Sequence, residues 1–493
     1  MAKVVVQWTI HMPKLQRIQD DKSRFVRLER AAVEEISHFL FALGNQFVGV
    51  RNAEGAFDCF RYSLDLNPKN QASCYNLGAL YNIMGNMDGA YRMFKEAVRM
   101  SPNDLTAQVA LGEVARKLSK IDESREVLEA AYKRDPDSYI TMSALAILHY
   151  DMGHLAEALE WNERALEKHP NDPHMMLNRA LVNMTFGFWE KYWAEYEFCL
   201  SYQKNERMRG MRMSDAWAGQ EMVGKTLLVV SDQGSGDAIQ FSRYLVEAKY
   251  LGKFAKLIYL VQSDLKELLA RVSGVDEVVG FGEKMKVDFD AFSSLLGIMR
   301  VLQVSPANCH RPPHVATDPK LDELWKCRVD ALWDGKSNKV GIVWAGDVRH
   351  GNDHARSLVL QQLLPLTRVD GVQLFSFQVG TAAVAQIASD PTGNFSQVID
   401  LGSDFRSFDD TASALRQMDL LVSCDTAVLH LAGCLGVPAW ALIAVPSEWR
   451  WLIDVGETNW YKSVRLFRQG KPKDWASVVE AVSSELHELV KHA

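Results

Sequence analysis

The spacing of apolar residues changes once along this chain of 493 residues. Over residues 37–206 apolar positions recur with the period of amphipathic helices. From about residue 225, short apolar runs such as "TLLVVS", "KLIYLVQ" and "KVGIVWAG" alternate with stretches of helical period. That alternation is typical of parallel sheets covered by helices. The sequence therefore predicts an α/α helical array followed by an α/β region.

The helical part repeats with a period of 34 residues. Small residues at the eighth and twentieth positions of the repeat let two antiparallel helices approach closely. A proline at the thirty-second position ends the second helix, because proline has no N–H to donate. The eighth position holds Gly44, Gly78, Gly112 and Ala146, and the prolines are Pro68, Pro102, Pro136 and Pro170. Four copies in phase resemble the tetratricopeptide repeat, whose helix pairs stack into a superhelix.

The segments that flank these four copies are less regular. We expect an N-terminal extension and capping helix over residues 1–36, and a fifth, degenerate repeat over residues 173–206. The aromatic stretch "FGFWEKYWAEYEFCL" in the fifth unit suggests a cap that docks onto the next domain. Because the concave face of such a superhelix commonly binds protein segments, residues 37–206 are expected to recognise a protein. A spacer or dimerisation arm is the alternative, so self-association stays open.

The α/β part holds enough strands for two sheets, over about 225–316 and 338–493. We expect a first Rossmann-like lobe with its hinge over residues 207–337, on the acceptor side, and a second lobe over 338–493, on the nucleotide side. Ligands of open parallel sheets bind beyond the carboxyl ends of the strands. The loops that follow the apolar runs are therefore the candidate sites.

The stretch "LLVSCDTAVLHLAGCLGVPAW" (420–440) predicts a buried strand, a short loop and a helix. The free N–H groups at the helix start, near Thr426 and Ala427, favour an anion. His430 lies one turn deeper on the same face and could donate to a phosphate or to a leaving-group oxygen. The alternative, which the local pattern leaves equally open, is that Asp425 caps the helix and His430 is a core histidine.

A second polar loop, "WAGDVRHGNDHARS" (344–357), follows the strand "KVGIV". Its donors suit a diphosphate, and Arg356 offers a planar, two-pronged contact. His350, Asn352 and Ser357 belong to the same candidate set. A solvated loop is the alternative.

The stretch "SDQGSGDAIQFSRYL" (231–245) follows the first apolar run and opens a helix with an acid. Asp237 is a candidate general base, which would take the proton of an attacking hydroxyl. The same carboxylate could cap its helix, and one residue can do both.

Two motifs match known binding patterns but are not expected to bind a ligand. "GQEMVGKT" (219–226) matches the phosphate-loop pattern but precedes its strand instead of following it. "DFD" (288–290) looks like a metal-binding acidic pair, but it lies inside an apolar stretch. Neither the cysteines nor the histidines show metal-ligand spacing, so we expect no metal site.

Residues 214–490 resemble bacterial tetratricopeptide-repeat glycosyltransferases whose catalytic part is similar to lipopolysaccharide heptosyltransferases. The overall layout also looks like O-GlcNAc transferase. The resemblance rests on "WAGQEMVGKTLLVVSDQGSGDAIQFSRYL", "VGIVWAGDVRHGNDHARSL", "DLGSDFRSFDDTASAL", "MDLLVSCDTAVLHLAGCLGVPAWALI" and "EWRWLIDVGETNWYKSVRLFRQ". The chain departs from the pattern in "SDQGSGD" and at Asp347, where relatives usually carry asparagine.

The resemblance implies a GT-B fold of two Rossmann-like lobes, a nucleotide-diphosphate sugar held mainly by the second lobe, and no essential metal. It maps the acid of the first lobe onto Asp237 after Gly236, and the Asp-Thr-x-x-x-His pattern onto Asp425, Thr426 and His430. Gln378, Trp449 and Arg450 lie in further loops expected to line the cleft, although aromatic packing explains the tryptophan equally well.

The predicted function is transfer of a sugar from a nucleotide-sugar donor to a hydroxyl of a protein, with no other cofactor. Flagellin is a candidate acceptor by analogy with similar proteins. The alternatives are transfer to lipopolysaccharide or another glycan, and an inactive repeat scaffold.

Composition narrows the partners and the compartment. The net charge of −7 argues against general nucleic-acid binding, which needs a basic surface. No apolar run is long enough to span a membrane, and the first residues lack the features of a signal peptide. The seven cysteines show no Cys-x-x-Cys pair. We therefore expect a cytoplasmic protein with reduced thiols.

Overall fold

The computed structural model describes residues 30–199, 211–283, 288–350, 352–453 and 455–492. The contacts within the chain divide it into two compact units that meet between Leu148 and His149. The predicted boundary between repeats and first lobe, at residues 206 and 207, lies outside the described residues, as do residues 1–29 of the N-terminal extension.

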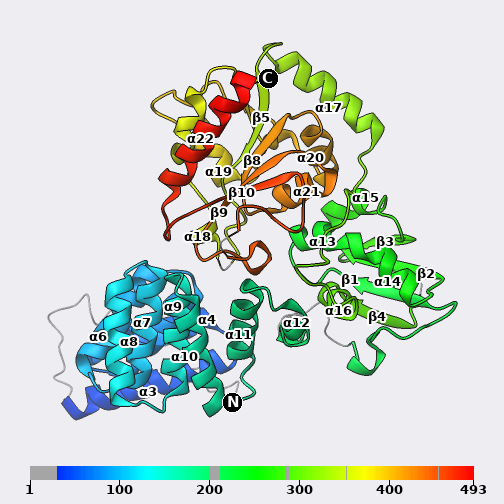
Figure 1. Ribbon diagram of the computed structural model, residues 1–493. Coiled ribbons are helices and arrows are strands. Elements are labelled where there is room, and N and C mark those ends of the chain that lie inside the picture. Colours follow the sequence, from blue (N-terminus) through cyan, green and yellow to red (C-terminus); the bar gives the residue numbers. More distant parts are fainter. Residues whose placement is uncertain (1–29, 200–210, 284–287, 351, 454, 493) are drawn as a thin grey trace. The chain divides into compact units, whose positions relative to one another are not determined.

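The first unit is a stack of helix pairs (Figure 1). Its helices are α3 (Arg30–Gly49), α4 (Ala53–Leu66), α5 (Gln71–Ile83), α6 (Met87–Met100), α7 (Leu105–Lys117) and α8 (Ile121–Arg134), and α9 (Tyr139–Asp151) runs across the boundary between the units. Asn52, Asn70, Asn86 and Asp104 each precede a helix and accept a hydrogen bond from an N–H of its first turn. These caps satisfy donors that the helix itself leaves unpaired.

The small residues of the repeat lie where the paired helices are closest. A Cβ added to Gly78 would lie 2.9 Å from the ring of Phe94, and one added to Gly112 would lie 2.6 Å from Leu128. In the first three repeats the glycine at the eighth position therefore faces the large apolar residue at the twenty-fourth position. This packing confirms the predicted helical superhelix.

The second unit begins with α10 (Leu155–Lys168), α11 (Pro173–Thr185) and α12 (Trp189–Glu197) and continues into a parallel sheet. The strands β1 (Thr226–Val230), β2 (Lys256–Val261), β3 (Glu277–Gly280) and β4 (Ala291–Ser294) have the order β3-β2-β1-β4. The helices of this lobe are α13 (Ser235–Phe241), α14 (Leu245–Leu251), α15 (Lys266–Leu269) and α16 (Leu295–Val301).

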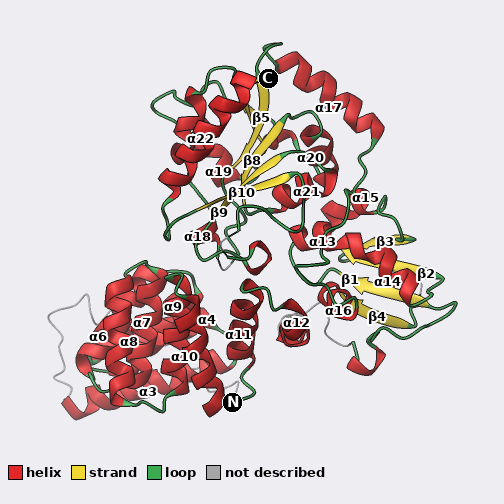
Figure 2. Cartoon of the chain, in the orientation of Figure 1, coloured by secondary structure: helices red, strands yellow, loops and turns green. Residues whose placement is uncertain are grey.

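Helix α17 (Pro319–Leu332) leads to a second parallel sheet (Figure 2). Its strands are β5 (Asn338–Val343), β6 (Val372–Ser376), β7 (Ile399–Asp400), β8 (Leu420–Cys424), β9 (Ala439–Ile443) and β10 (Val464–Arg468), in the order β10-β9-β8-β5-β6-β7. Its helices are α18 (Asp353–Arg356), α19 (Thr381–Ala388), α20 (Phe408–Leu415), α21 (Ala427–Leu435) and α22 (Trp475–His492). Counted within this lobe the order is 3-2-1-4-5-6, that of the Rossmann fold. The predicted fold class, repeats followed by two Rossmann-like sheets, is confirmed.

Successive residues of the central strand β8 face opposite cores. Leu420 and Val422 pack in a core that includes Val479 of α22, whereas Leu421 packs with residues of α20 and α21. This alternation gives the second lobe its three layers of helix, sheet and helix.

Helix α12 supplies an aromatic cluster that reaches both lobes. Trp189 stacks on Trp460 at a centroid distance of 5.0 Å and meets Trp449 edge-on at 5.2 Å. The indole of Trp193 donates to the carbonyl of Val304 in the first lobe at 2.6 Å. Trp189 and Trp193 of the fifth repeat are thus core residues of the α/β unit.

The phosphate-loop-like match and the "DFD" motif, neither of which is expected to bind a ligand, contact each other. Lys225, the lysine of the phosphate-loop-like match, lies 2.9 Å from the carboxylate of Asp290, the last acid of "DFD". Asp290 also accepts a hydrogen bond from the N–H of Thr226, the first residue of β1. Both residues therefore brace the amino end of this strand, opposite the edge where ligands of such sheets bind.

Candidate functional site

The candidate site lies where the carboxyl ends of strands from both lobes meet. In the second sheet the chain order reverses between β5 and β8, which is the switch point where such folds bind ligands. The loops after these strands carry Arg356 and Asp425. Helix α13, which follows β1 of the first lobe, packs directly against α21 of the second, and a Cβ added to Gly236 would lie 2.9 Å from Cδ2 of His430.

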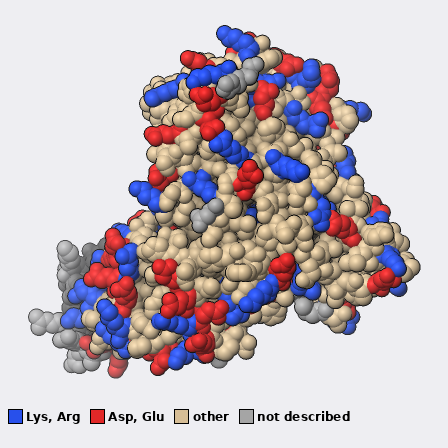
Figure 3. All heavy atoms as spheres, in the orientation of Figure 1, with Lys and Arg blue, Asp and Glu red and all other residues tan. Residues whose placement is uncertain are grey.

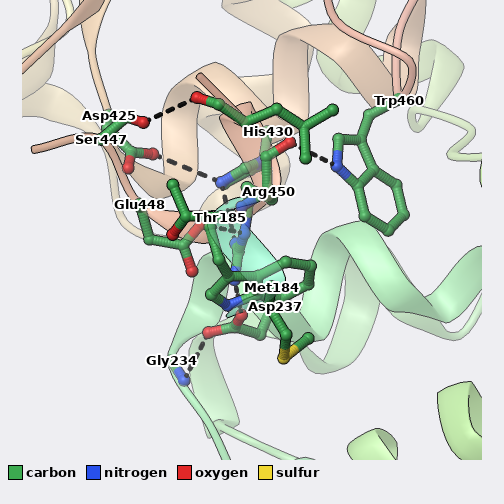
Figure 4. A network of polar contacts seen from close by, with 12 residues as sticks. Met184, Thr185, Gly234, Asp237, Asp425, His430, Ser447, Glu448, Arg450 and Trp460 are labelled. Atoms are coloured by element: carbon green, nitrogen blue, oxygen red, sulfur yellow. Dashed lines mark hydrogen bonds and ion pairs between the residues drawn. The ribbon is translucent and has the colours of Figure 1, made fainter. Parts of the chain in front are cut away.

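Asp237 combines two structural contacts. Its Oδ2 accepts a hydrogen bond from the N–H of Gly234 at 3.1 Å, which caps α13. Its Oδ1 accepts from Nη2 of Arg450 at 2.6 Å, across the boundary between the lobes. The carboxylate of the first lobe and the guanidinium of the second are therefore directly paired (Figure 4).

Arg450 is the centre of a polar network. It belongs to the short helix η8 (Trp449–Trp451) after β9, and only 8% of its surface is exposed. Its Nε lies 2.9 Å from Oε2 of Glu448, and Nη1 lies 3.2 Å from Nε2 of His430. One buried guanidinium thus links two carboxylates and an imidazole, as Figure 4 shows.

His430 is a neutral, fixed imidazole. Its Nδ1 lies 3.0 Å from the hydroxyl of Tyr461, and its ring stacks on Trp451 with the two planes 7° apart. Burial lowers the pKa of His430, and the charge of Arg450 lowers it further, although Asp425 acts in the opposite direction. The neutral ring can accept from Arg450 at Nε2 while Nδ1 donates to Tyr461.

The start of α21 is not capped by the side chain of its N-cap residue. Its N-cap residue, Thr426, makes no side-chain hydrogen bond to the first turn; its hydroxyl lies 3.1 Å from that of Ser423 instead. The N–H groups near Ala427 are therefore not capped by Thr426 and, with the helix dipole, favour an anion. Arg356 approaches the same turn, because its Nη1 donates to the backbone carbonyl of Asp425 at 3.1 Å.

Asp425 stays ionised. Burial by itself would raise the pKa of its carboxyl, but the charge of Arg450 helps to hold that pKa well below its usual range. Its negative charge opposes an anion at the start of α21, so Arg356 and Arg450 must supply the compensating charge there.

Glu448 is the unusual carboxylate of the network. Its Oε2 accepts from the N–H of Arg450 at 2.9 Å and also faces Nε of that residue. Desolvation raises the pKa of Glu448 to about 7; the negative charges of Asp425 and Asp237 add to the shift, and the charge of Arg450 reduces it. Such a value allows the group to exchange a proton near neutral pH.

The network joins Asp237, Gly236, Asp425, His430 and Arg450, five of the residues singled out from sequence. His350 lies near it, since the charges of Asp237, Asp425 and Arg356 all act on that histidine, and its Nδ1 accepts from the N–H of Asn352 at 3.2 Å.

Three other predicted residues have structural contacts of their own. The side-chain amide of Gln378 is engaged by the backbone of the loop after β5: its Oε1 accepts from Trp344 and Ala345, and its Nε2 donates to Ala345 and Val379. Ser357 accepts from Gly346 and donates to Asp353. Trp449 is fully buried in the α12 aromatic cluster. These residues shape the loops that carry the site instead of presenting free polar groups to it.

Sequence reasoning missed Glu448, Trp451 and Tyr461. Glu448 stood next to the two residues selected in "EWRWL" and follows the apolar run of β9. An acid just beyond the carboxyl end of a strand was the signal that could have revealed it. Among the described residues no group of three or more histidines, cysteines and carboxylates has the arrangement of a metal site.

Comparison with known proteins supports the first part of the chain most directly. Residues 72–104 and 109–173 match the tetratricopeptide repeat family. The helical repeats are tetratricopeptide repeats. Because such repeats commonly bind protein segments, they indicate a protein partner.

One curated relative is the protein FlbA of Caulobacter vibrioides, 25% identical over 345 residues, an alignment that covers 64% of this chain and 55% of FlbA. This chain therefore spans little more than half of that relative. Among solved structures, MamA is 18% identical with a TM-score of 0.28 and covers 32% of this chain and 92% of its own. PilW, a type IV pilus biogenesis factor, is 20% identical with a TM-score of 0.31 and covers 33% and 77%.

Surface charge and helix hydropathy can be compared with what nucleic-acid-binding and membrane proteins require. Acidic and basic side chains are interspersed over the described residues on the face shown in Figure 3, unlike the continuous basic stripe of many nucleic-acid-binding proteins. None of the described helices is long and apolar enough to cross a membrane.

Proposed function

We propose that this chain is a glycosyltransferase that moves a sugar from a nucleotide-diphosphate donor to a hydroxyl of a protein. The observation that carries the proposal is the meeting of Asp237, from the first lobe, with the start of α21, from the second, around Arg450. Such a transfer needs a carboxylate that takes up a proton and fixed donors that bind the diphosphate, and groups of both kinds surround Arg450.

In this reaction the acceptor oxygen forms a bond to the anomeric carbon as the bond from that carbon to the diphosphate oxygen breaks. The nucleoside diphosphate leaves with the electron pair, and the hydroxyl proton passes to a carboxylate of the site. The N–H groups at the start of α21, which Thr426 does not cap, would stabilise the charge that develops on the leaving group, together with Arg356 and Arg450. Fixed donors of this kind usually supply the largest share of catalysis.

Two carboxylates flank Arg450 and could receive the proton, Asp237 and Glu448. Direct attack by the hydroxyl inverts the anomeric centre. The tetratricopeptide repeats favour a protein over a glycan as acceptor, and the cytoplasm as compartment follows from the same proposal, since nucleotide sugars are used there.

A repeat scaffold without catalysis is the second candidate. One observation favours it: Asp237, the predicted base, already has one oxygen engaged in a helix cap and the other in an ion pair. A scaffold would still bind a protein through its repeats but would neither bind nor consume nucleotide sugars.

The test is a panel of nucleotide sugars, with thermal shift to detect binding and release of nucleoside diphosphate to detect turnover. Transfer requires that at least one sugar raises the melting temperature and is consumed, with a matching mass increase on an acceptor protein. Running the assay with a chelator checks metal independence. If no sugar of the panel is bound or consumed, glycosyl transfer is rejected and a repeat scaffold without catalysis is the remaining candidate function.

A further inference from the structure

Two carboxylates share the guanidinium of Arg450, and they come from different lobes. Asp237 lies on α13 of the first lobe, and Glu448 lies on the segment after β9 of the second (Figure 4). Oxygen atoms of the two residues lie 2.6 Å and 2.9 Å from nitrogen atoms of the same side chain.

The two carboxylates differ in what their oxygen atoms already bind. Oδ1 of Asp237 accepts from Arg450, and Oδ2 accepts from the N–H of Gly234. In Glu448, Oε2 takes both contacts with Arg450, while Oε1 has no hydrogen-bond partner among the described residues. The side chain of Glu448 keeps 28% of its surface exposed. Glu448 can therefore accept a hydrogen bond from a substrate hydroxyl at an oxygen atom that has no partner among the described residues, whereas each oxygen atom of Asp237 already accepts one.

The charges around Glu448 favour proton uptake near neutral pH. Arg450 on its own segment stabilises the carboxylate, and Asp425 before α21 and Asp237 on α13 destabilise it. Tyr150 of α9 and Tyr196 of α12 also interact electrostatically with Glu448. Both phenols stay neutral, because burial raises the pKa of each. The surrounding charge is thus two carboxylates against one guanidinium.

Glu448 also lies on the side of the last repeat helices. The turn before α10 reaches its segment, since a Cβ added to Gly153 would lie 2.8 Å from the side chain of Val445. Ile453, five residues after Glu448, packs with Leu155 and Val182 of α10 and α11. The segment that carries Glu448 is therefore packed against the last repeat helices on both sides of that residue.

We propose that Glu448 is the catalytic residue that accepts the proton of the acceptor hydroxyl, and that Asp237 positions Arg450. This inference rests on the proposed glycosyl transfer. As the acceptor oxygen bonds to the anomeric carbon, its proton moves to Oε1 of Glu448, and the diphosphate leaves with the electrons of the broken bond. The proton returns to solvent through the exposed edge of the side chain.

The experiment compares the pH dependence of kcat/KM for the full chain and its Glu448→Gln, Glu448→Asp, Asp237→Asn and Glu457→Gln variants. In the unsubstituted chain kcat/KM rises with pH to a plateau above about 7, because the base must be ionised. Glu448→Gln lowers the plateau roughly a hundred- to ten-thousand-fold and removes the rise. Glu448→Asp keeps the rise at a lower plateau, and Asp237→Asn lowers the plateau but keeps the rise. Glu457→Gln, an exposed change in the same segment, leaves the profile unchanged.

Nucleotide affinity, measured by thermal shift, identifies variants that lose activity because they misfold. If Glu448→Gln misfolds, the pH profile of Glu448→Asp is used to test the inference instead. The inference is overturned if Glu448→Gln keeps the rise, or if only Asp237→Asn removes it. Either result leaves glycosyl transfer itself intact. Absence of turnover by the unsubstituted chain with every donor would instead remove the proposed function, and this inference with it.

Discussion

Gly236 of α13 and His430 of α21 touch across the boundary between the two lobes, with no room for a side chain on the glycine. A Cβ on Gly236 would lie 2.9 Å from Cδ2 of His430 and 3.4 Å from Cα of Ala427. This close approach brings the next residue, Asp237, within hydrogen-bond distance of Arg450. The spacing of two helices therefore sets the geometry of the polar network.

Substitution of Gly236 by alanine is expected to push the helices apart. Overpacking typically costs about 1–3 kcal/mol, which exceeds the gain of up to about 1 kcal/mol from replacing glycine in a helix. The melting temperature should fall, and transfer should fall further as the Asp237–Arg450 pair lengthens. Gly234→Ala is the matched control, because its Cβ would meet only the carboxylate of Asp237, at 3.4 Å. Equal effects of the two changes would show that the contact does not set the spacing.

Removal of Arg450 should destabilise the chain strongly. Arg450→Met leaves the carboxylates of Asp237 and Glu448 without their cation, and breaking a buried pair costs about 3–5 kcal/mol. The control is Arg465→Met, which breaks the pair with Glu485 in which both side chains are more than 40% exposed; it should cost less than about 1 kcal/mol. Chemical denaturation measures both, and similar costs would contradict the central place of Arg450.

The raised pKa of Glu448 should make the free energy of unfolding depend on pH. Its pKa is about 7 in the folded chain, above the ordinary value of 4.5, so the folded state binds the proton more tightly than the unfolded state does. Its contribution is favourable below about pH 4.5 and is lost as the pH rises through 7, by up to about 3 kcal/mol. Glu448→Gln should therefore be more stable than the parent at pH 8, and the difference should shrink toward pH 5. A difference that is constant with pH would show that Glu448 titrates normally.

The α12 aromatic cluster should be essential to the α/β unit. Trp189→Ala removes a fully buried indole and is expected to cost about 3–5 kcal/mol. Phe188→Ala, at the neighbouring residue with 56% of its surface exposed, should have little effect. Thermal unfolding followed by limited proteolysis of the α/β region measures the change. Protection of that region in Trp189→Ala would mean that α12 is dispensable to it.

Arg356 should bind the nucleotide. Arg356→Ala is expected to weaken nucleoside-diphosphate affinity at least tenfold, the scale of one lost charge-assisted hydrogen bond. Arg349→Ala in the same loop is the control, since Arg349 is 86% exposed and pairs with Asp347. Calorimetric titration gives both affinities. Unchanged affinity in Arg356→Ala would place the nucleotide elsewhere.

Local patterns predicted most of the fold. The glycines and prolines of the repeat act within 34 residues, and the contact of Gly78 with Phe94 is a direct consequence of that spacing. The switch-point loops after β5 and β8 followed from strand alternation. The strand order itself did not, because β8 pairs with β5 across two intervening strands, β6 and β7, and the helices around them, whose packing no local pattern encodes.

The site was predicted as a set of loops but not as a network. Asp237 and Arg450 are 213 residues apart, and their pairing depends on how two lobes pack. Gln378 has the polarity of a ligand-binding residue, yet the backbone of its own neighbouring loop uses its amide. The raised pKa of Glu448 arises first from burial in the fold and then from the charges of Asp425 and Asp237; Asp237 is remote in sequence and close in space.

The division between Leu148 and His149, together with the burial of Trp189 and Trp193, bears on how such chains are recombined. A chimeric chain in which all five repeats are replaced would lose the tryptophans of α12 from the α/β core, and apolar surface would be exposed. A cut in the turn before α9, just ahead of that division, keeps that core whole and exchanges only the preceding helix pairs. The protein segment that the repeats bind could then be changed by exchange of those helix pairs, while the α/β unit stays intact.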